Sequence, residues 1–370
     1  MIYHLLPEME PFSEFRSGAI AKNVADIMRL DDSRIAVCSA ADDAWGFSPD
    51  RIILVPELRA YAKIRGRHRL PARLTAMFFR YVFKRLLARI SDQDIVWCDN
   101  QPYFAAALEK SIHSKNAKLI YHAHDGIASP QVRRALCSFS ADAYIFVSKA
   151  LLQDRSKLLP RMVETYAIHN GADEALFHPL PVGASRHNAV PVVLYVGRLH
   201  PEKGVHVLME AMRILLERKV HAICKVIGSS YTGGSKPTAY VKSLLKHSPP
   251  NVRFEGYRLQ TEIADEYRAA DVFCCPSVWQ EPFGKTNIEA MACGTPVVAT
   301  RVGGIPEIAA EGGIILVEPG SAIELADALQ SLIQDQGLRE RVAAEGLKSF
   351  RKSFTWAAIM KEYQIVVNNL

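Results

Sequence analysis

Short apolar runs alternate with longer amphipathic stretches through almost all of this 370-residue chain. A short apolar run bounded by turn residues is typical of a buried strand, and a longer stretch with helical spacing is typical of a surface helix. Repeated alternation of this kind is the pattern of parallel sheets with helices on both faces. The sequence therefore predicts an α/β protein with doubly wound sheets.

The alternation gives specific expectations for each half of the chain. In the first half we expect strands at 35–40, 51–55, 94–99, 118–122, 143–147 and 166–169, and helices at 19–30, 72–90 and 103–115. In the second half we expect strands at 192–196, 223–227, 252–255, 272–275, 297–300 and 314–317, and helices at 203–217, 240–247, 262–270, 284–292 and 323–334.

The length of the chain predicts two domains, because a single core rarely grows this large. The segment 177–191 is rich in Pro and Gly and lacks periodicity, which is typical of a hinge. We therefore expect Rossmann-like domains at 1–180 and 188–352, facing each other across a cleft, with a helix at about 355–370 packing back on the first domain. Ligands of such sheets bind at the carboxyl ends of the strands.

Composition indicates an ordinary globular protein without disulfides or membrane-spanning segments. The net charge is +6 and 49% of the residues are hydrophobic, as in an ordinary globular protein. Seven cysteines without C-x-x-C spacing predict reduced thiols, with neither disulfides nor a zinc site. The sequence has no signal-peptide pattern and no apolar run long enough to span a membrane. We expect a cytoplasmic protein, peripheral on the inner face of the cell membrane.

Two carboxylates, Glu281 and Glu289, flank a Pro-Phe-Gly turn that leads into a helical run. The backbone N–H groups at such a helix start favour an anion, and a nearby carboxylate can accept hydrogen bonds from vicinal hydroxyls of a sugar or ribose. The spacing alone fits a surface helix with a capping glutamate equally well. The alternative that we favour is a nucleotide-sugar site.

Other strand ends in the same half strengthen that interpretation. Gly197 follows an expected strand and is flanked by Arg198 and Lys203, two cations that suit a diphosphate, although ordinary surface cations would look the same. Gly303 and Gly304 mark another tight turn between a strand and a helix. In a parallel sheet these turns and the Glu281 segment lie on one edge.

Together these segments resemble the retaining glycosyltransferases of family four, which have the GT-B fold. The matching motifs are Gly197-Arg198-Leu199 with Lys203-Gly204, the pair Glu281 and Glu289, and Asn170-Gly171-Ala172-Asp173 before Phe177-His178-Pro179. The resemblance extends through nearly the whole chain and is strongest from about residue 118 onward. It implies a hexosyltransferase that uses a nucleotide-sugar donor, which we expect to be a UDP-sugar.

The resemblance also implies roles for individual residues. Arg198 and Lys203 would hold the donor diphosphate, Glu289 the ribose hydroxyls and Glu281 the transferred sugar. Catalytic roles would fall to His124, Glu281, Arg198 and Lys203, and the donor-binding set would be completed by Gly197, Phe283, Gly284, Lys285, Thr286 and Glu289. Arg16, Ser17 and Gly18 would form the acceptor-side loop, although the family's usual Gly-Gly pair is represented by one glycine.

The choice between two histidines stays open. His124 matches the family's His-Asp motif at a strand end, but His122 lies two residues earlier and so on the same strand face. A histidine that merely forms a hydrogen bond at the strand end is the structural alternative for His124.

The expected chemistry needs no metal and no cofactor. Arg198, Lys203 and helix-terminal N–H groups would stabilise the charge that develops on the leaving diphosphate. A metal-dependent transferase typically carries Asp-x-Asp after a strand, whereas Asp92-Gln93-Asp94 precedes one and is interpreted as a turn. Retention then implies front-side attack, since no carboxylate is clearly placed as a nucleophile.

Residues 59–89 contain ten cations and no acid, interleaved with aromatic residues. This pattern is typical of stretches that bind anionic membrane surfaces, and a solvated helix face is the alternative. Nothing else in the sequence supports binding of nucleic acid.

The segments around 116–124 and 197–204 look most like bacterial N-acetylglucosaminyltransferases of the lipopolysaccharide core. We therefore expect a cell-envelope glycan or glycolipid as the acceptor. The alternatives are a UDP-sugar epimerase of the GT-B fold and a non-catalytic nucleotide-sugar-binding partner. A dinucleotide-dependent dehydrogenase is disfavoured because no Gly-x-Gly-x-x-Gly opens a helix.

Overall fold

The structure is a computed structural model that describes residues 1–8, 10–13, 18–42, 45–59, 61, 72–125, 130–160, 163–181, 188–230 and 237–370. The chain forms two compact units. The first contains Met1–His169 and Met360–Leu370, and the second contains Asn170–Ile359. The predicted boundaries were 180 and 188, whereas this division comes after His169 and again within the last helix.

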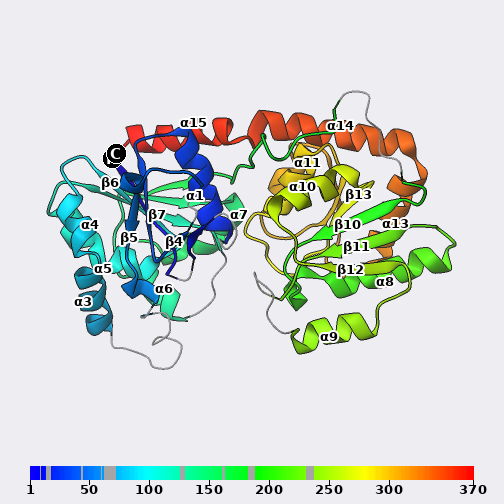
Figure 1. The fold of residues 1–370 in the computed structure, drawn as a ribbon, viewed down its shortest axis with the longest axis horizontal. Helices are drawn as coiled ribbons and strands as arrows, with labels where there is room; N and C mark the ends of the chain where they lie inside the picture. The colour runs from blue at the N-terminus through cyan, green and yellow to red at the C-terminus, as the bar shows by residue number, and fades with distance from the viewer. Residues whose placement is uncertain are drawn as a thin grey trace. The chain divides into compact units, whose positions relative to one another are not determined.

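The first unit is built on a seven-stranded sheet in the order β5-β3-β1-β6-β7-β8-β9 (Figure 1). All of its pairings are parallel. Its strands are β1 (Ile2–Leu5), β3 (Arg34–Cys38), β5 (Ile52–Leu54), β6 (Ile95–Asp99), β7 (Lys118–Ala123), β8 (Ala143–Phe146) and β9 (Glu164–Ala167). A short pair, β2 (Phe12–Ser13) and β4 (Ala41–Asp42), lies outside this sheet. The strand order reverses direction between β1 and β6.

The helices of this unit are α1 (Ala19–Leu30), α3 (Ala72–Val82), α4 (Lys84–Arg89), α5 (Pro102–His113), α6 (Pro130–Leu136) and α7 (Lys149–Arg155), with 3-10 turns at Pro49–Arg51 and Ser156–Leu158. Helix α1 buries one face, which includes Val24 and Met28, against Ala36 and Cys38 of β3. Helix α5 packs on β7 and also contacts α3 and α6.

The second unit contains a six-stranded parallel sheet in the order β12-β11-β10-β13-β14-β15. Its strands are β10 (Val192–Val196), β11 (Ile223–Ile227), β12 (Val252–Gly256), β13 (Val272–Cys275), β14 (Val297–Thr300) and β15 (Ile314–Val317). This is the strand order of a Rossmann-type sheet, and it reverses direction between β10 and β13. Ligands of such sheets bind where the order reverses, beyond the carboxyl ends of the strands.

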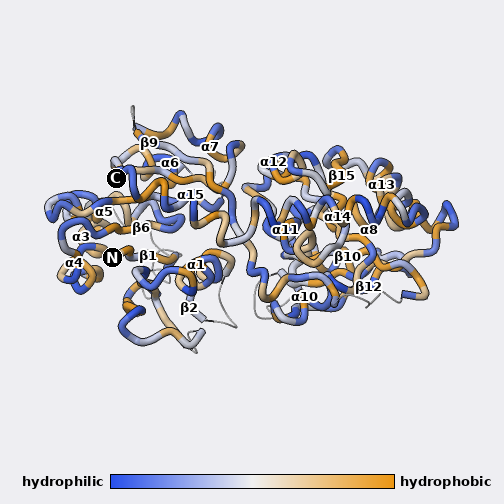
Figure 2. The backbone as a smooth tube through the Cα atoms, turned by 90° about the horizontal axis from the view of Figure 1, so that it is seen from above, coloured by the Kyte–Doolittle hydropathy of each residue, from blue (hydrophilic) through white to orange (hydrophobic). Residues whose placement is uncertain are grey.

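Helices cover both faces of the second sheet (Figure 1). The helices of this unit are α8 (Val205–Glu217), α9 (Ala239–Lys246), α10 (Gln260–Ala269), α11 (Lys285–Ala292), α12 (Ile305–Ala309), α13 (Ala322–Gln334) and α14 (Gln336–Ser353), with a 3-10 turn at Pro201–Lys203. The last helix, α15 (Trp356–Asn368), begins in this unit and belongs to the first unit from Met360 onward. Helices α8 and α13 share a core with side chains from one sheet face, including Val193, Cys224 and Val298. Helix α13 alternates between hydrophilic and hydrophobic residues along its length (Figure 2), and its buried residues include Leu325 and Leu329.

The fold class and most of the expected elements are confirmed. The predicted helix at 19–30 coincides with α1, and the predicted strands at 192–196, 223–227, 272–275, 297–300 and 314–317 coincide with observed strands. The single helix expected at 72–90 was wrong, because Phe83 leaves the helical conformation and separates α3 from α4. The sequence analysis also missed β1 and α14. Among the described residues, no helix is long and apolar enough to cross a bilayer.

Candidate functional site

The loops that follow β10, β13 and β14 carry the predicted donor-binding residues. These three strands are neighbours in the parallel sheet, so their carboxyl ends lie on one edge. Gly197 and Arg198 follow β10, Glu281 follows β13, and Gly303 follows β14. The first two loops lie where the strand order reverses, which is the expected position of a ligand site in such a sheet.

Lys203 and Glu281 form the central contact of this edge. The Lys203 Nζ lies 2.8 Å from Oε1 and 2.7 Å from Oε2 of Glu281. Ser277 Oγ and Trp279 Nε1 also donate to Oε2 of Glu281, at 3.0 Å and 2.9 Å. The Lys203 ammonium lies 5.3 Å from the centre of the Trp279 ring. Two opposite charges are therefore held in fixed positions by donors that lie outside the pair.

The backbone of Glu281 is held equally closely by the loop after β14. The Gly304 N–H donates to the Glu281 carbonyl at 2.8 Å. Gly303 has a φ of +53°, and a Cβ at this position would lie 1.9 Å from the Glu281 carbonyl oxygen. Only glycine leaves room for that approach, so the Gly303-Gly304 pair positions the Glu281 loop.

Arg198 lies beside a small cavity of about 110 Å³ at the carboxyl ends of β10 and β11. Its side chain is exposed, and its carbonyl accepts a hydrogen bond from the Tyr195 hydroxyl at 2.9 Å. The other lining residues are Val196, Gly197, Ile227, Gly228, Ser229, Tyr257, Arg258 and Ile263. A Cβ at Gly228 would lie 1.9 Å from the Gly197 carbonyl oxygen, so these two turns touch through their backbones.

Helix α11 begins beside this edge and carries the second glutamate. Its N-cap is Gly284, with a φ of +97°, so its first N–H groups have no side-chain cap. Phe283 is buried, whereas Lys285 and Thr286 in the first turn are partly exposed. The Glu289 Oε2 accepts a hydrogen bond from the Tyr267 hydroxyl at 3.2 Å. Burial, together with the nearby Glu289, raises the pKa of Tyr267 well above its usual value, so this hydroxyl stays a donor.

In the first unit, three histidines surround Asp99 at the end of β6. The Asp99 Oδ2 lies 2.9 Å from His4 Nδ1, and Oδ1 lies 3.2 Å from His124 Nε2 and 3.5 Å from His122 Nδ1. The parallel register pairs Asp99 with His122, which explains why residues from neighbouring strands meet here. His124 directly follows β7.

The two candidate histidines have different environments. His122 is buried, its Nδ1 lies 3.2 Å from the Trp97 Nε1 donor, and its Nε2 has no hydrogen-bond partner. Burial and, to a smaller extent, the nearby His124 lower the pKa of His122 to about 3, so this ring is neutral. His124 is less buried and follows the strand end, where ligands of parallel sheets bind. These contacts favour His124 over His122 as a substrate-facing group.

The acceptor-side loop is described only in part, because Arg16 and Ser17 lie outside the described residues. Gly18 is the N-cap of α1. A Cβ at Gly18 would lie 2.4 Å from Oε1 of Glu10, whose other oxygen accepts from the Ala21 N–H at 3.0 Å. Burial raises the pKa of Glu10. Gly18 thus makes room for a carboxylate that caps α1, and Glu10 is a residue that the sequence analysis missed.

Asp99, His122 and His124 are also the one group in the described residues with metal-ligating atoms within 4.8 Å of one another. Nitrogen and carboxylate oxygen are ligand types that Zn²⁺ accepts. However, Asp99 already accepts from His4, and the His122 Nδ1 faces the Trp97 N–H, so these atoms are used within the protein. The hydrogen-bond pattern therefore fits a protein network better than a metal site. Asp92-Gln93 forms a turn before β6, as expected.

Sequence comparison relates this chain to known glycosyltransferases. Residues 184–349 match the family described as glycosyl transferases group 1. Spore coat protein SA of Bacillus subtilis is 27% identical over 287 residues, which cover 72% of this chain and 76% of that protein. D-inositol 3-phosphate glycosyltransferase of Corynebacterium efficiens is 38% identical over 200 residues, which cover 51% of this chain but only 47% of that protein.

Solved structures match over the whole chain. The Anabaena protein Alr3699/HepE in complex with UDP-glucose has a TM-score of 0.76 at 22% identity, with 100% of this chain and 99% of that chain covered. Sucrose-phosphate synthase from Thermosynechococcus elongatus has a TM-score of 0.75 at 20% identity, with 100% and 98% covered. At this identity the likeness establishes the fold.

The two parallel α/β sheets and these full-length structural matches define a protein of the GT-B fold. The protein is a glycosyltransferase. Its similarity to the family described as glycosyl transferases group 1 lies in residues 184–349, which are less than half of the chain.

Proposed function

We propose that this protein transfers a hexose, N-acetylglucosamine or a related sugar, from a UDP-sugar to a hydroxyl of a cell-envelope glycan, with retention of the anomeric configuration. A lipopolysaccharide core or a lipid-linked oligosaccharide is the acceptor that we favour. The bound UDP-glucose named for the Anabaena structure and the sugar-transferring relatives support the donor class. The arrangement of Lys203 and Glu281 is the observation that carries the proposal.

The donor diphosphate would lie against Arg198, Lys203 and the N-terminus of α11. Negative charge grows on this group as the bond from the sugar C1 to the phosphate oxygen breaks. Fixed cations and backbone N–H groups stabilise such charge without reorganising during the reaction. The protein itself then supplies the positive charge, so the proposed reaction needs no metal ion.

The two glutamates would bind the two parts of the donor that flank the diphosphate. Glu281, held by Ser277, Trp279 and Lys203, would accept hydrogen bonds from hydroxyls of the transferred sugar. Glu289 would accept from the ribose hydroxyls, with one of its oxygens oriented by Tyr267. The cavity lined by Arg198, Tyr257 and Arg258 is where the uracil would bind. The acceptor oxygen would attack C1 from the same face, and its proton would pass to the leaving phosphate oxygen.

The basic stretch at 59–89 is the feature that supports a lipid-linked acceptor. Helix α3 exposes Leu74, Met77 and Tyr81, at 51%, 66% and 63%, with the three-to-four-residue spacing of one helix face. Exposed Arg80, Lys84, Arg85 and Arg89 follow in α3 and α4. Lys63, Arg65, Arg67 and Arg69 lie outside the described residues. An exposed apolar stripe beside cations suits an anionic membrane surface that carries a lipid-linked acceptor.

Incubation with a panel of UDP-sugars tests the reaction class. A transferase should release UDP from one of them slowly by hydrolysis, and faster once a suitable glycan is added, both with EDTA present. Formation of an epimeric UDP-sugar from donor alone would identify the epimerase alternative. Tight UDP-sugar binding without any turnover across a broad acceptor set would favour the non-catalytic alternative. Loss of turnover in EDTA that Mg²⁺ or Mn²⁺ restores would contradict the metal-independent mechanism.

A further inference from the structure

A chain of buried polar contacts leads from the surface of the first unit to His124. The Arg34 Nε donates to Asp31 at 2.7 Å, and its Nη1 lies 2.8 Å from the Nε2 of His4. The His4 Nδ1 lies 2.9 Å from Oδ2 of Asp99, and Oδ1 of Asp99 lies 3.2 Å from Nε2 of His124. Arg34, His4 and Asp99 are at most 1% exposed. Such a buried series fixes each of its members in one hydrogen-bonding role.

The protonation state of each member follows from its neighbours. An arginine can only donate, so the His4 Nε2 must accept and the proton of this ring lies on Nδ1. The His4 N–H therefore donates to Asp99. Burial lowers the pKa of His4, so this ring is neutral and does not cancel the charge of Asp99. Burial alone would raise the pKa of Asp99, but the hydrogen bonds that its carboxylate accepts from the neighbouring histidines hold it well below its usual range.

We infer that Asp99 is a positioning residue that holds His124 in the tautomer with the proton on Nε2 and a bare Nδ1. An anionic carboxylate can only accept, so the His124 Nε2 must donate to it. In the described part of the chain, the His124 Nδ1 has no protein partner. That nitrogen is then available to accept a hydrogen bond from a substrate hydroxyl. The hydrogen bond from Nε2 to Asp99 and the bond from the His124 backbone N–H to Asn100 Oδ1 restrict the position of this ring.

The consequence for the reaction rests on the proposed function. If His124 lies near the reacting centre, a bare Nδ1 orients a hydroxyl of the donor sugar or the acceptor by accepting its proton in a hydrogen bond. A ring protonated on Nδ1 would donate instead and would leave that hydroxyl misoriented. Serine protease triads show the size of such an effect, since an amide in place of the orienting carboxylate costs about 10⁴-fold in turnover.

The variant Asp99→Asn reverses the tautomer for a structural reason. The His4 Nδ1–H stays a donor because Arg34 still occupies its Nε2. The carbonyl oxygen of the introduced amide must therefore face His4, and its NH₂ group must face His124. The His124 Nε2 then has to accept, which moves the proton to Nδ1. Asp142→Asn is the matched control, because the Asp142 Oδ2 lies 2.9 Å from His113 Nε2 in a half-exposed pair of the same unit.

Nitrogen-15 NMR of histidine-labelled protein at pH 8.5 tests the inference directly. The signals of His124 are assigned by their loss in His124→Gln. We expect the wild-type ring to be protonated on Nε2 alone, and the ring in Asp99→Asn to be protonated on Nδ1. A wild-type His124 protonated on Nδ1, alone or on both nitrogens, overturns the proposal. So does a stoichiometric bound metal ion that is lost in Asp99→Asn. The wild-type spectrum decides even if the variant does not fold.

Kinetics give a second readout with the UDP-sugar that is hydrolysed fastest. We expect Asp99→Asn to lower kcat on the order of 10²–10⁴-fold with the KM for the donor unchanged, and Asp142→Asn to change neither. A merely structural role would instead lower the thermal stability and the fraction of active protein, with normal kcat per active site. If no UDP-sugar reacts, the proposed function fails while the NMR result still decides the tautomer.

Discussion

At the scale of single residues, the two units each centre on a carboxylate that is surrounded by donors. Glu281 is held by Lys203, Ser277 and Trp279, and Asp99 by His4 and His124. Glu281 was singled out in the sequence by its spacing to Glu289 together with the neighbouring strand-end motifs. Asp99 was not, because its contacts depend on the register between strands whose residues are far apart in the sequence. The sequence signal that could have indicated Asp99 is its position at the end of an expected strand, followed in the chain by another expected strand with His122 and His124 at its end.

Glu281→Gln should separate binding of the nucleotide from turnover of the sugar. The variant keeps the shape of Glu281 but leaves the Lys203 ammonium without its counter-charge, so the affinity for UDP should stay the same or rise. The hydrogen bonds to the transferred sugar weaken, so kcat with the UDP-sugar should fall on the order of 10²-fold. Calorimetry with UDP and steady-state kinetics measure the two effects. An equal loss of UDP affinity would place Glu281 against the diphosphate instead.

His122 should make the first unit less stable in acid. Its folded-state pKa, about 3, lies below the value of about 6.5 in the unfolded chain, so the unfolded chain binds the extra proton. The contribution of the neutral His122 ring to the free energy of unfolding is fully present above pH 6.5, and it is lost as the pH falls from 6.5 toward 3. When the pH falls from 7.5 to 5.5, protonation of His122 in the unfolded chain should lower the free energy of unfolding by about 1.4 kcal/mol. The neutral His4 ring should lower it further, because burial also lowers the pKa of His4.

Hydrogen exchange of the β6 and β7 amides, corrected for intrinsic rates, measures this loss. The variant His122→Gln keeps an acceptor for Trp97 but does not titrate in this range. Its opening free energy should therefore depend less steeply on pH than that of the wild type. An identical slope in both proteins would mean that His122 does not carry the effect.

At the scale of elements, four strands of the second unit were predictable because each is a short apolar run with Gly, Pro or Asp at one or both ends. These strands are β10, β13, β14 and β15. The edge strand β9, expected at 166–169, begins at Glu164 and is partly exposed, so its apolar signal is weaker. Strand β1 was missed because the run at Ile2–Leu5 is short and includes His4, which pairs with Arg34 and Asp99. A polar network inside a strand interrupts the apolar pattern that sequence reasoning relies on.

Gly303→Ala should displace the Glu281 loop. Its Cβ would meet the Glu281 carbonyl at 1.9 Å, in addition to the strain of a positive φ. We expect a loss of stability of about 1–3 kcal/mol and weaker binding of UDP-sugar. Gly320→Ala is the control, because Gly320 has a φ of +79° but nothing within 4 Å of the added Cβ. If both variants bind UDP-sugar as the wild type does, the close contact does not position the site.

Helix α3 should contribute to membrane binding. Replacing Leu74 and Met77 by Ser removes the exposed apolar side chains without changing charge, and should weaken sedimentation with vesicles that contain anionic lipid. Wild-type binding should fall with added salt and be absent on neutral vesicles, because the cations interact with the anionic headgroups. Ile323→Ser is a control at an exposed apolar position of α13. Equal binding to neutral and anionic vesicles would contradict this interaction.

At the scale of the whole molecule, each sheet brings its polar residues to the place where its strand order reverses. In the first unit, His4 of β1 meets Asp99 of β6. In the second, Lys203 after β10 meets Glu281 after β13. The doubly wound class and this convergence could be predicted from the sequence, because parallel strands share one edge for their carboxyl ends. The hydrogen bonds of Glu281 with Ser277 and Trp279 could not, because they depend on side-chain positions within a loop.

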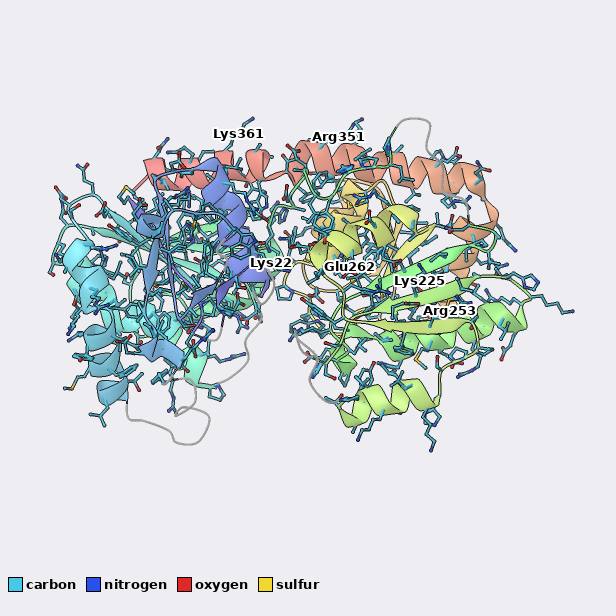
Figure 3. All side chains as sticks on the ribbon, viewed as in Figure 1. Lys22, Lys225, Arg253, Glu262, Arg351 and Lys361 are labelled. Atoms are coloured by element: carbon cyan, nitrogen blue, oxygen red, sulfur yellow. The ribbon has the colours of Figure 1, made fainter. Side chains whose placement is uncertain are left out.

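Calorimetric titration of UDP into the wild type, Lys203→Met and Lys225→Met tests the central claim that the β10–β13 edge holds the donor diphosphate. Lys225, on β11 (Figure 3), pairs with Glu266 at 2.8 Å and is the matched control in the same unit. We expect Lys203→Met to weaken UDP binding by about 1.5–3 kcal/mol, since a charge-assisted contact is lost, and Lys225→Met to leave it unchanged. Unchanged UDP binding in Lys203→Met, or an equal loss in both variants, would contradict the account.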